Sequence, residues 1–518
     1  MLVRTYRGRV AAPVAGVVAP VALVAYAGLA ALVALAALAA PGPARADPFI
    51  APGRTELRAD LQTLADAGII TAPVTAWPLN WQSIVGGIDD ADPAVLSPAV
   101  QAALDRVRTE LRLDAQTHRL LPHVRLGGTT EPPALFSFSA TPRETGELEG
   151  GASYTGDRLS FNLRATRAID SYDDWRPDGS YAGFAIRNWA VVGGYPERWW
   201  GPGIQGSLIL STNARPVPQI GVERISASAF EPGWLRWLGP WTVSSFIGEL
   251  DDPRVVEDAK LFGFRMTARP LPQLEVAFSR TAQLCGAGRP CGIEQLTNML
   301  LGRDNRGVNV DAADEPGNQL AGLDGRWSFT GRPFAFYWQW IGEDSRRGGP
   351  QIGSWLRLVG AELTGPVAAT AWRHRTWFEL ADTTCQEGGG GFGDTKYNCA
   401  YEHSTYQTGY RYEGRPLGHT TDTDSESLAV VSLFSGPGSS AWELGLSTVR
   451  INQAPTPNPR HSVSAAPARR HGVEVAHIRD LALGRLRLRL SLTELNNELT
   501  GLSERDANLA LEWLVGYW

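Results

Sequence analysis

The side chains best suited to bind a ligand lie in one short block, Tyr195–Gly203, which reads Tyr-Pro-Glu-Arg-Trp-Trp-Gly-Pro-Gly. Trp199 and Trp200 offer flat apolar faces on which the C–H groups of a pyranose can stack, and Glu197 and Arg198 offer charged groups for its hydroxyls. These residue types at this spacing indicate a carbohydrate-binding site. The alternative is structural: the two indoles pack under the Gly-Pro-Gly turn or lie in a membrane-interface belt.

Four cysteines fall into two local pairs, Cys285 with Cys291 and Cys385 with Cys399. In an oxidising compartment, an even number of cysteines in glycine-rich loops indicates disulfides. Three connectivities are possible, and we favour the local one because each pair closes a short loop at a small entropic cost. Zinc bound with the help of His403 is the alternative, but no Cys-x-x-Cys spacing or second nearby ligand supports it, so we expect no metal.

A polar stretch contains His419, Asp422 and Ser425, the side-chain types of a hydrolase triad. A spacing of three within one strand or loop does not by itself orient a histidine onto a serine. We therefore interpret these residues as polar lining of a lumen or rim, with a hydrolase as the alternative, and we predict no catalytic residue.

Two other motifs could hold a cofactor. Asp422, Asp424 and Glu426 could contribute to a calcium site, but calcium needs six or more oxygens and usually a tight glycine turn. The run Gly388–Gly393 is not followed by Lys-Ser or Lys-Thr, so it does not match a phosphate-binding loop. We expect no cofactor.

The N-terminus carries a targeting pattern. Met1–Arg9 is basic, Val10–Ala40 is uncharged and apolar, and Ala44–Ala46 is a small-x-small cleavage pattern, so we predict a signal peptide over residues 1–46. An uncleaved membrane anchor is the alternative because the uncharged run is long enough to span a bilayer. Pro20 weighs against that alternative.

The charge balance excludes nucleic-acid partners. The chain has 48 basic and 54 acidic side chains, a net charge of -6, and no basic run. The predicted signal peptide contains four arginines, so its loss would leave 44 basic against 54 acidic groups, a net charge of -10. Only Lys260 and Lys396 are lysines, so guanidinium groups suited to bidentate contacts carry nearly all the positive charge.

Two elements must position these candidates, and the first is helical. Leu57, Leu61 and Leu64 recur at helical spacing before Gly68, and a second helical pattern runs from Ser97 to Leu113. Residues 47–121 therefore form a small helical unit. Such a unit is too small to bury much core by itself, so it must pack on something larger.

From residue 122 to 518 the hydrophobic period is 2. In Arg485–Thr493 four leucines alternate with three arginines, and Arg158–Thr166 and Phe334–Ile341 alternate in the same way. A soluble sheet and an outer-membrane barrel both give this pattern. The signal peptide, the 18 tryptophans and an aromatic last residue, Trp518, favour a barrel in the outer membrane.

Several long motifs resemble the Wzi family of outer-membrane capsule assembly proteins. These motifs are Glu197–Gly203, Leu208–Ser211, Asn213–Pro216, Gly248–Asp252, Lys260–Gly263, Gln339–Asp344, Asp382–Cys385, Tyr397–Cys399, Tyr401, His403, Tyr406, Gly409–Arg411, Gly414–Arg415, Gly418–His419 and Asp422–Ser425. The resemblance implies an all-β transmembrane barrel of about 18 antiparallel strands with a small α-helical bundle on its periplasmic side.

The resemblance also implies a non-enzymatic surface lectin that helps to assemble or attach capsular polysaccharide or exopolysaccharide. Its motifs include Arg215, Tyr401 and His403, which we expect to contact the glycan together with the 197–200 block. Expected partners are the polysaccharide, outer-membrane lipid, the outer-membrane insertion machinery and polysaccharide export proteins. A barrel hydrolase and a porin-like channel are the alternatives.

Overall fold

The computed structural model describes residues 49–114, 116–169, 175–292, 317–345, 352–368, 370–387 and 393–516. The predicted signal peptide, most of the glycine run 388–393 and the aromatic residue Trp518 lie outside these ranges. Among the described residues, no helix combines the length and the hydropathy needed to cross a membrane.

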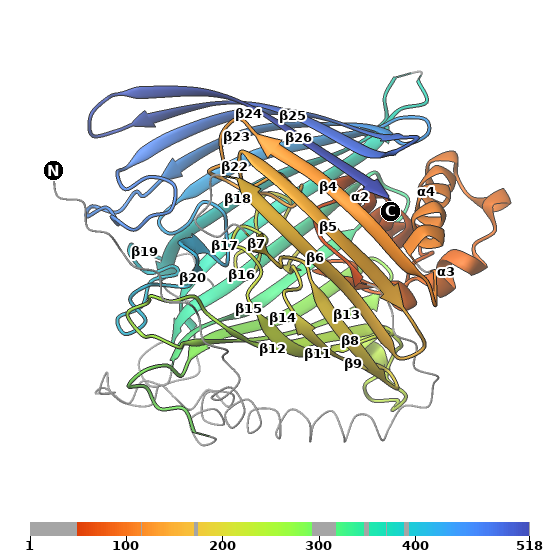
Figure 1. Cartoon of the computed structure of the whole chain (residues 1–518), viewed down its shortest axis with the longest axis horizontal. Coiled ribbons are helices and arrows are strands. Elements are labelled where there is room, and N and C mark those ends of the chain that lie inside the picture. Colours follow the sequence, from red (N-terminus) through yellow and green to blue (C-terminus); the bar gives the residue numbers. More distant parts are fainter. Residues whose placement is uncertain are drawn as a thin grey trace.

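Eighteen antiparallel strands close into a barrel in this part of the chain (Figure 1). Neighbouring strands pair in sequence order, and β26 returns to pair with β4, so the sheet has no free edge. The strands are β4 (Leu120–Thr129), β5 (Gly146–Thr155), β6 (Leu159–Ile169), β8 (Tyr181–Ile186), β9 (Trp189–Gly194), β11 (Gln219–Arg224), β12 (Trp241–Glu249), β13 (Lys260–Leu271), β14 (Leu274–Leu284), β15 (Gly317–Ser328), β16 (Phe334–Ser345), β17 (Ile352–Pro366), β18 (Arg373–Glu387), β22 (Glu426–Ser435), β23 (Ser440–Ile451), β24 (Ala468–Leu481), β25 (Gly484–Asn497) and β26 (Ser503–Gly516). Two-residue strands, β7 (Trp175–Arg176) and β19 (Thr395–Lys396), extend the sheet. The predicted barrel and its strand number are confirmed.

Strand β25 shows which face of the wall meets lipid. Leu490 and Leu492 are 46% and 50% exposed, whereas Arg487 and Arg489 are 5% and 8% exposed. The leucines therefore point outward and the arginines inward, as the alternation predicted. Leucines on other strands continue this outward apolar belt, among them Leu126, Leu148, Leu163, Leu323, Leu380, Leu446 and Leu509.

The helices lie at one end of the barrel and partly within it (Figure 1). They are α2 (Thr55–Asp66), α3 (Val85–Asp90) and α4 (Pro98–Asp114), with short 3-10 turns η1 (Trp81–Ser83), η2 (Pro93–Val95) and η3 (Arg236–Leu238). Gly68 follows α2 with a φ of 77°, a conformation that suits glycine and ends the helix. Strand β4 begins at Leu120, two residues before the expected start of the barrel.

The two ends of the barrel differ in the length of their connections. At the helical end most turns are short, such as 156–158, 272–273 and 482–483, although the connection 225–240 is longer. At the opposite end, which we call the loop end, the long connections are 130–145, 195–218, 285–316, 388–425 and 452–467.

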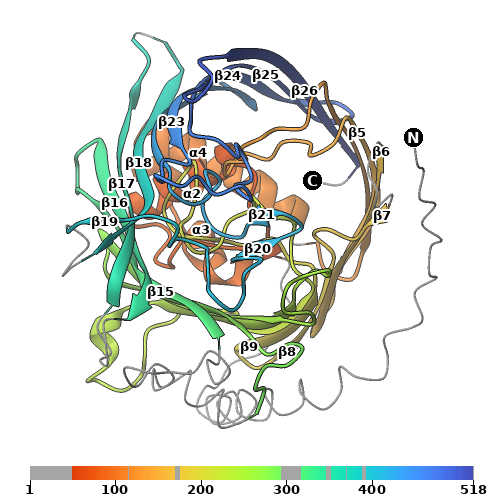
Figure 2. The same cartoon turned by 90° about the vertical axis from the view of Figure 1, so that its left-hand side faces the viewer.

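One large hydrophobic core extends through the lumen, which the strands encircle in Figure 2. It joins Leu61 and Leu64 of α2 to Trp199 and Trp200 of the 195–218 segment, and then to Tyr401 and Tyr410 of the 388–425 segment. The sequence patterns indicated only that the helical unit packs on something larger. The contribution of these two loop-end segments to the core was not predicted. Three pairs of short strands lie inside the barrel: β10 (Trp199–Trp200) with β2 (Ala76–Trp77), β1 (Phe49–Ile50) with β3 (Leu79–Asn80), and β20 (Arg411–Tyr412) with β21 (Arg415–Pro416).

Carboxylates on the barrel wall accept hydrogen bonds from backbone N–H groups of the segments inside the lumen. Glu275 accepts hydrogen bonds from the backbone N–H groups of Val74 at 3.0 Å and Thr75 at 2.8 Å. Glu379 accepts from the N–H groups of residues 204, 205 and 206 at 2.6, 3.0 and 3.2 Å. Hydrogen bonds to an ionised carboxylate are stronger than neutral ones, so these contacts fix the lumen segments to the wall.

Candidate functional site

The tryptophan block lies deep in the lumen. Trp199 and Trp200 are 0% and 1% exposed. Trp199 packs edge-on against Phe138 at 5.3 Å between ring centroids, and Trp200 packs against Phe246 at 5.7 Å. Protein atoms thus cover the indole faces. The two tryptophans pack inside the molecule, which is the structural alternative to a carbohydrate-binding role.

The charged members of the block have protein partners as well. Arg198 is buried and donates to Gln219 Oε1 at 2.7 Å and to Ser244 Oγ at 2.8 Å, and it forms an ion pair with Glu223 at 2.8 Å. Glu197 is partly buried, and desolvation raises the pKa of its carboxyl. Arg198 therefore ties the lumen segment to β11 and β12.

Arg215 clamps two loops at the loop end. Its guanidinium donates to the carboxylate of Asp178 at 2.8 and 3.0 Å, and to that of Glu413 at 2.8 and 2.9 Å. These two carboxylates raise the pKa of Arg215 against the effect of burial. The side chain stays charged and holds connections that lie far apart in the sequence.

Tyr401 is also internal, at 0% exposure. Its hydroxyl donates to the carbonyl of Leu208 at 2.8 Å and accepts from the N–H of His419 at 2.9 Å. Tyr401 therefore joins two lumen segments and has no surface open to a sugar.

His403 lies in a different setting, a hollow of about 810 Å³ at the loop end. Most of its lining residues are polar or charged, and two are prolines. The lining residues are Asn318, Glu343, Lys396, Asn398, Cys399, Glu402, His403, Ser404, Gln407, Thr456, Pro457, Asn458, Pro459 and Arg460. We call this feature the loop-end hollow.

The floor of the loop-end hollow is a network around Glu402. Its carboxylate accepts from Asn458 Nδ2 at 2.7 Å and forms ion pairs with Arg411 at 2.7 Å and Arg460 at 2.9 Å. The backbone N–H groups of Thr405 and Tyr406 donate to His403 Nδ1 at 3.1 and 3.2 Å. Nδ1 of His403 is therefore a hydrogen-bond acceptor in this network.

Exposed donors and acceptors line the mouth of the hollow. Asn398, Ser404, Gln407 and Arg460 are all exposed. An amide, a hydroxyl and a guanidinium around a shallow polar hollow can exchange hydrogen bonds with the hydroxyls of a glycan, at little cost in desolvation.

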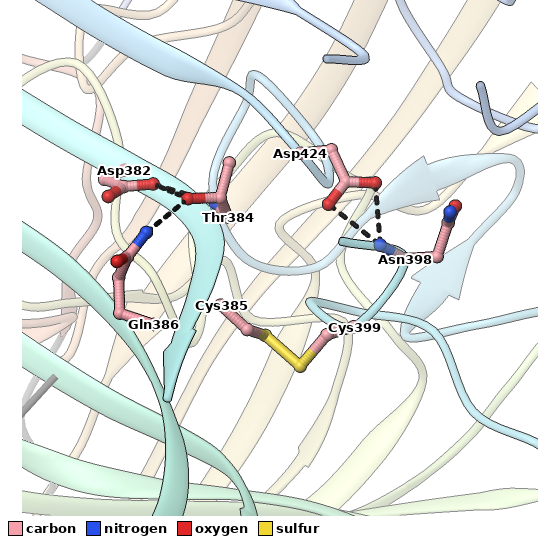
Figure 3. The surroundings of a disulfide bond; sticks show 7 residues. All are labelled: Asp382, Thr384, Cys385, Gln386, Asn398, Cys399 and Asp424. Atoms are coloured by element: carbon pink, nitrogen blue, oxygen red, sulfur yellow. Dashed lines mark hydrogen bonds between the residues drawn. A yellow bond between two sulfur atoms is a disulfide. The ribbon is translucent and has the colours of Figure 1, made fainter. Parts of the chain in front are cut away.

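A disulfide supports the hollow from the barrel wall (Figure 3). Cys385 on β18 is bonded to Cys399, with 5.9 Å between their Cα atoms. Next to it, both carboxylate oxygens of Asp424 accept from the N–H of Asn398, at 3.0 and 2.9 Å. Burial raises the pKa of Asp424 to about 6. The predicted local pairings are confirmed, because Cys285 is likewise bonded to Cys291.

The possible hydrolase residues do not form a triad. The imidazole of His419 lies 2.8 Å from the hydroxyl of Thr421, and burial lowers its pKa to about 4. Ser425 Oγ instead lies 3.3 Å from His461 Nε2 and is fully buried. The triad spacing in the sequence therefore does not correspond to a nucleophile held by its base and open to a substrate.

The possible calcium ligands have separate partners. Asp422 pairs with Arg411 at 2.6 Å, Asp424 binds the N–H of Asn398, and Glu426 pairs with Arg450 at 2.8 Å. Within the described ranges, no group of three or more His, Cys, Asp or Glu side chains is arranged to hold a metal ion.

Sequence reasoning missed most of the loop-end hollow. Of the seven predicted glycan contacts, His403 lines it; Glu402, Gln407, Asn458 and Arg460 were not predicted. The Pro-Asn-Pro run at residues 457–459 is a turn signal that marks an exposed loop, but it does not indicate where that loop packs.

Known proteins show the same architecture. The sequence profile of the family described as Capsule assembly protein Wzi matches residues 118–435. The structure of Wzi from Escherichia coli, an outer-membrane protein involved in group 1 capsule assembly and described as a carbohydrate-binding β-barrel, superposes with a TM-score of 0.76 at 25% identity. That match covers 91% of this chain and 100% of the other.

A protein of 55.8 kDa from the cps region of Klebsiella pneumoniae is 32% identical over 298 residues. The match covers 56% of this chain and 57% of that relative, so it spans little more than half the length of either protein.

Proposed function

Because this chain belongs to the Wzi family of capsule assembly proteins, we propose that it binds a surface polysaccharide and helps to attach or assemble it as capsule or exopolysaccharide. The protein is a β-barrel of the outer membrane. The observation that carries the proposal is the loop-end hollow, an open polar surface built from two long connections on a rigid barrel.

The orientation follows from the connections. Outer-membrane barrels have short periplasmic turns and longer extracellular loops. The helical end, with its short turns, then faces the periplasm, and the loop end faces the medium. This orientation makes residues 47–121 a periplasmic plug and presents the loop-end hollow to a polymer outside the cell.

A binding role fits the chemistry better than catalysis. Ser425 and His461 are buried below the hollow, and its lining offers hydrogen bonds without an activated nucleophile. A passive channel fits poorly as well, because one packed core links the helices, the tryptophan block and the tyrosines across the lumen. Weak hydrogen bonds at each repeat of a long polymer add up through multivalency.

Arg460→Ala tests the hollow. The Arg460 side chain is half exposed at the mouth, so its loss removes exposed donors and the ion pair with Glu402 without emptying a packed site. We expect binding of purified protein to polysaccharide extracted from the source cells to weaken about tenfold, as for loss of one charged hydrogen bond. Arg112→Ala, an exposed arginine of α4 at the helical end, is the matched control.

Two outcomes would contradict the proposal. Equal binding by Arg460→Ala and the unchanged protein would remove the hollow as the glycan site. A deletion strain that stopped making polymer, instead of releasing it from the surface, would indicate a role in synthesis.

A further inference from the structure

The outer wall of the barrel has a groove on the lipid side, away from the loop-end hollow. Two connected hollows of about 670 and 640 Å³ share Leu428, Thr448 and His471. Their walls come from outward-facing side chains of β16–β18 and β22–β26 near the loop end. We call this feature the outer-wall groove.

The lower part of the groove is aliphatic. Its outward side chains include Leu428, Leu446, Val473 and Leu492, all more than 40% exposed. These residues belong to the apolar belt that meets lipid, so the groove is continuous with the membrane interface. Burial against hydrocarbon chains is favourable for such an aliphatic surface.

The upper part of the groove is charged and forms a row across neighbouring strands. Arg357 faces Asp382, Asp382 faces Glu426, Glu426 faces Arg450, and Arg450 faces Arg469. Arg357 and Asp382 pair at 2.6 Å, and Glu426 pairs with Arg450 at 2.8 Å. Both carboxylates of the row therefore already have a guanidinium partner.

The end of the row is two arginines directly opposite each other, Arg450 and Arg469. Like charges in this position repel each other, and the carboxylates that pair with them, Glu426 and Glu498, belong to other residues of the wall. Their side chains are 52% and 51% exposed, and the ion pair of Arg469 with Glu498 is long, at 3.4 Å. His471 lies two residues after Arg469 on the same face of β24, closer to the apolar belt, and it faces Glu494 on β25.

We propose that the outer-wall groove binds a phosphorylated glycolipid of the outer leaflet, with a phosphate between Arg450 and Arg469 and acyl chains along the aliphatic wall. Planar guanidinium groups suit bidentate contacts to phosphate. The nearby carboxylates of Glu426 and Glu494 can accept hydroxyls of the sugar headgroup. The site is separate from the loop-end hollow; it rests on the outward orientation of the loop end but not on glycan binding there.

The probe is diphosphorylated, hexa-acylated lipid A, added to the full chain in detergent and counted by native mass spectrometry. We expect Arg450→Gln with Arg469→Gln to lower the bound fraction at least fivefold, and Arg469→Gln alone to lower it in part. Arg167→Gln is the matched control, because Arg167 is an exposed arginine near the loop end of β6 on another part of the wall. Heat-modifiable migration shows that each variant is folded.

Three results would overturn the proposal. The first is a loss smaller than fivefold in the double variant, or an equal loss in Arg167→Gln. The second is an equal affinity for phosphatidylglycerol, which would indicate a site for any anionic lipid. The third is displacement of lipid A by millimolar inorganic phosphate, which would indicate a site for the free anion.

Discussion

Replacing Asp324 by alanine is expected to destabilise the folded barrel by about 3–5 kcal/mol, the usual loss when one partner of a buried ion pair is removed. Asp324 on β15 accepts two hydrogen bonds from Arg265 on β13, at 2.6 and 2.9 Å, and both side chains are 1% exposed. In the variant Arg265 would keep its contact with Ser279 Oγ at 2.7 Å, but its charge would have no carboxylate partner.

The assay is urea unfolding of the protein in lipid vesicles, followed by tryptophan fluorescence. A loss of 3–5 kcal/mol changes the unfolding constant by about two to four powers of ten. Asp480→Ala is the control, because Asp480 forms an equally short pair with Arg485, at 2.5 Å, but is 39% exposed. An exposed pair contributes about 1 kcal/mol or less, so this variant is expected to unfold almost as the unchanged protein does.

A second variant separates charge burial from packing. Arg265→Met combined with Asp324→Leu leaves no unpaired charge in the wall, and such apolar replacements are often close to neutral. We expect the double variant to regain most of the lost stability. Two results would contradict this reasoning. One is a decrease of less than 1 kcal/mol in the free energy of unfolding for Asp324→Ala, and the other is a double variant no more stable than the single one; either would show that burial of the charge does not determine the stability that this pair contributes.

Two further predictions concern the support of the loop-end hollow. Cys385→Ser with Cys399→Ser is expected to lower the free energy of unfolding by about 3 kcal/mol, because the bond closes a loop with a sequence separation of 14; the same titration with a reductant checks it. Burial raises the pKa of Asp424 to about 6 from 3.8, so between about pH 4 and 6 the folded protein holds a proton that the unfolded chain has released. The free energy of unfolding therefore falls as pH rises through this window, and we expect Asp424→Asn to remove that fall in titrations at pH 4, 5, 6 and 7. An unchanged pH profile in the variant would contradict the assignment.

The barrel wall could be predicted from the sequence because, in each strand, the alternation of apolar and polar residues shows which side chains face lipid and which face the lumen. In β25 the leucines face lipid and the arginines face the lumen, and a one-residue shift would exchange the two sets. The helix that ends before Gly68 was predictable for a similar reason, since its spacing and its stop signal are local.

The filling of the lumen could not be predicted in this way. A tryptophan packs equally well in a core or at a membrane interface, so the sequence of Trp199 and Trp200 did not indicate whether they lie inside the barrel or at its surface. The same ambiguity led to the expectation that this block contacts a glycan. The loop-end hollow depends on contacts between residues 402 and 458 or 460, and no periodic pattern connects positions that far apart in the sequence.

The scarcity of lysine follows from how the interior is held together. Arg326 bridges Glu362 of the wall to Asp66 at the end of α2, with two hydrogen bonds to each carboxylate at 2.6–2.9 Å. Arg411 likewise lies between Asp422 and Glu402, which links the interior to the floor of the loop-end hollow. A lysine ammonium is a single point charge and cannot span two carboxylates with this geometry.

These bridges also explain how a surface of long loops can recognise a flexible polymer. Each loop that is already fixed before binding loses less conformational entropy on contact, so more of each weak hydrogen bond appears as affinity. In this protein the disulfide Cys385–Cys399 and the bridge from Arg411 to Asp422 and Glu402 fix the loop-end hollow from below. A substitution deep in the lumen that loosened these supports would therefore weaken glycan binding without touching the glycan, whereas Arg460→Ala would remove an exposed donor at the mouth together with one of the ion pairs of Glu402.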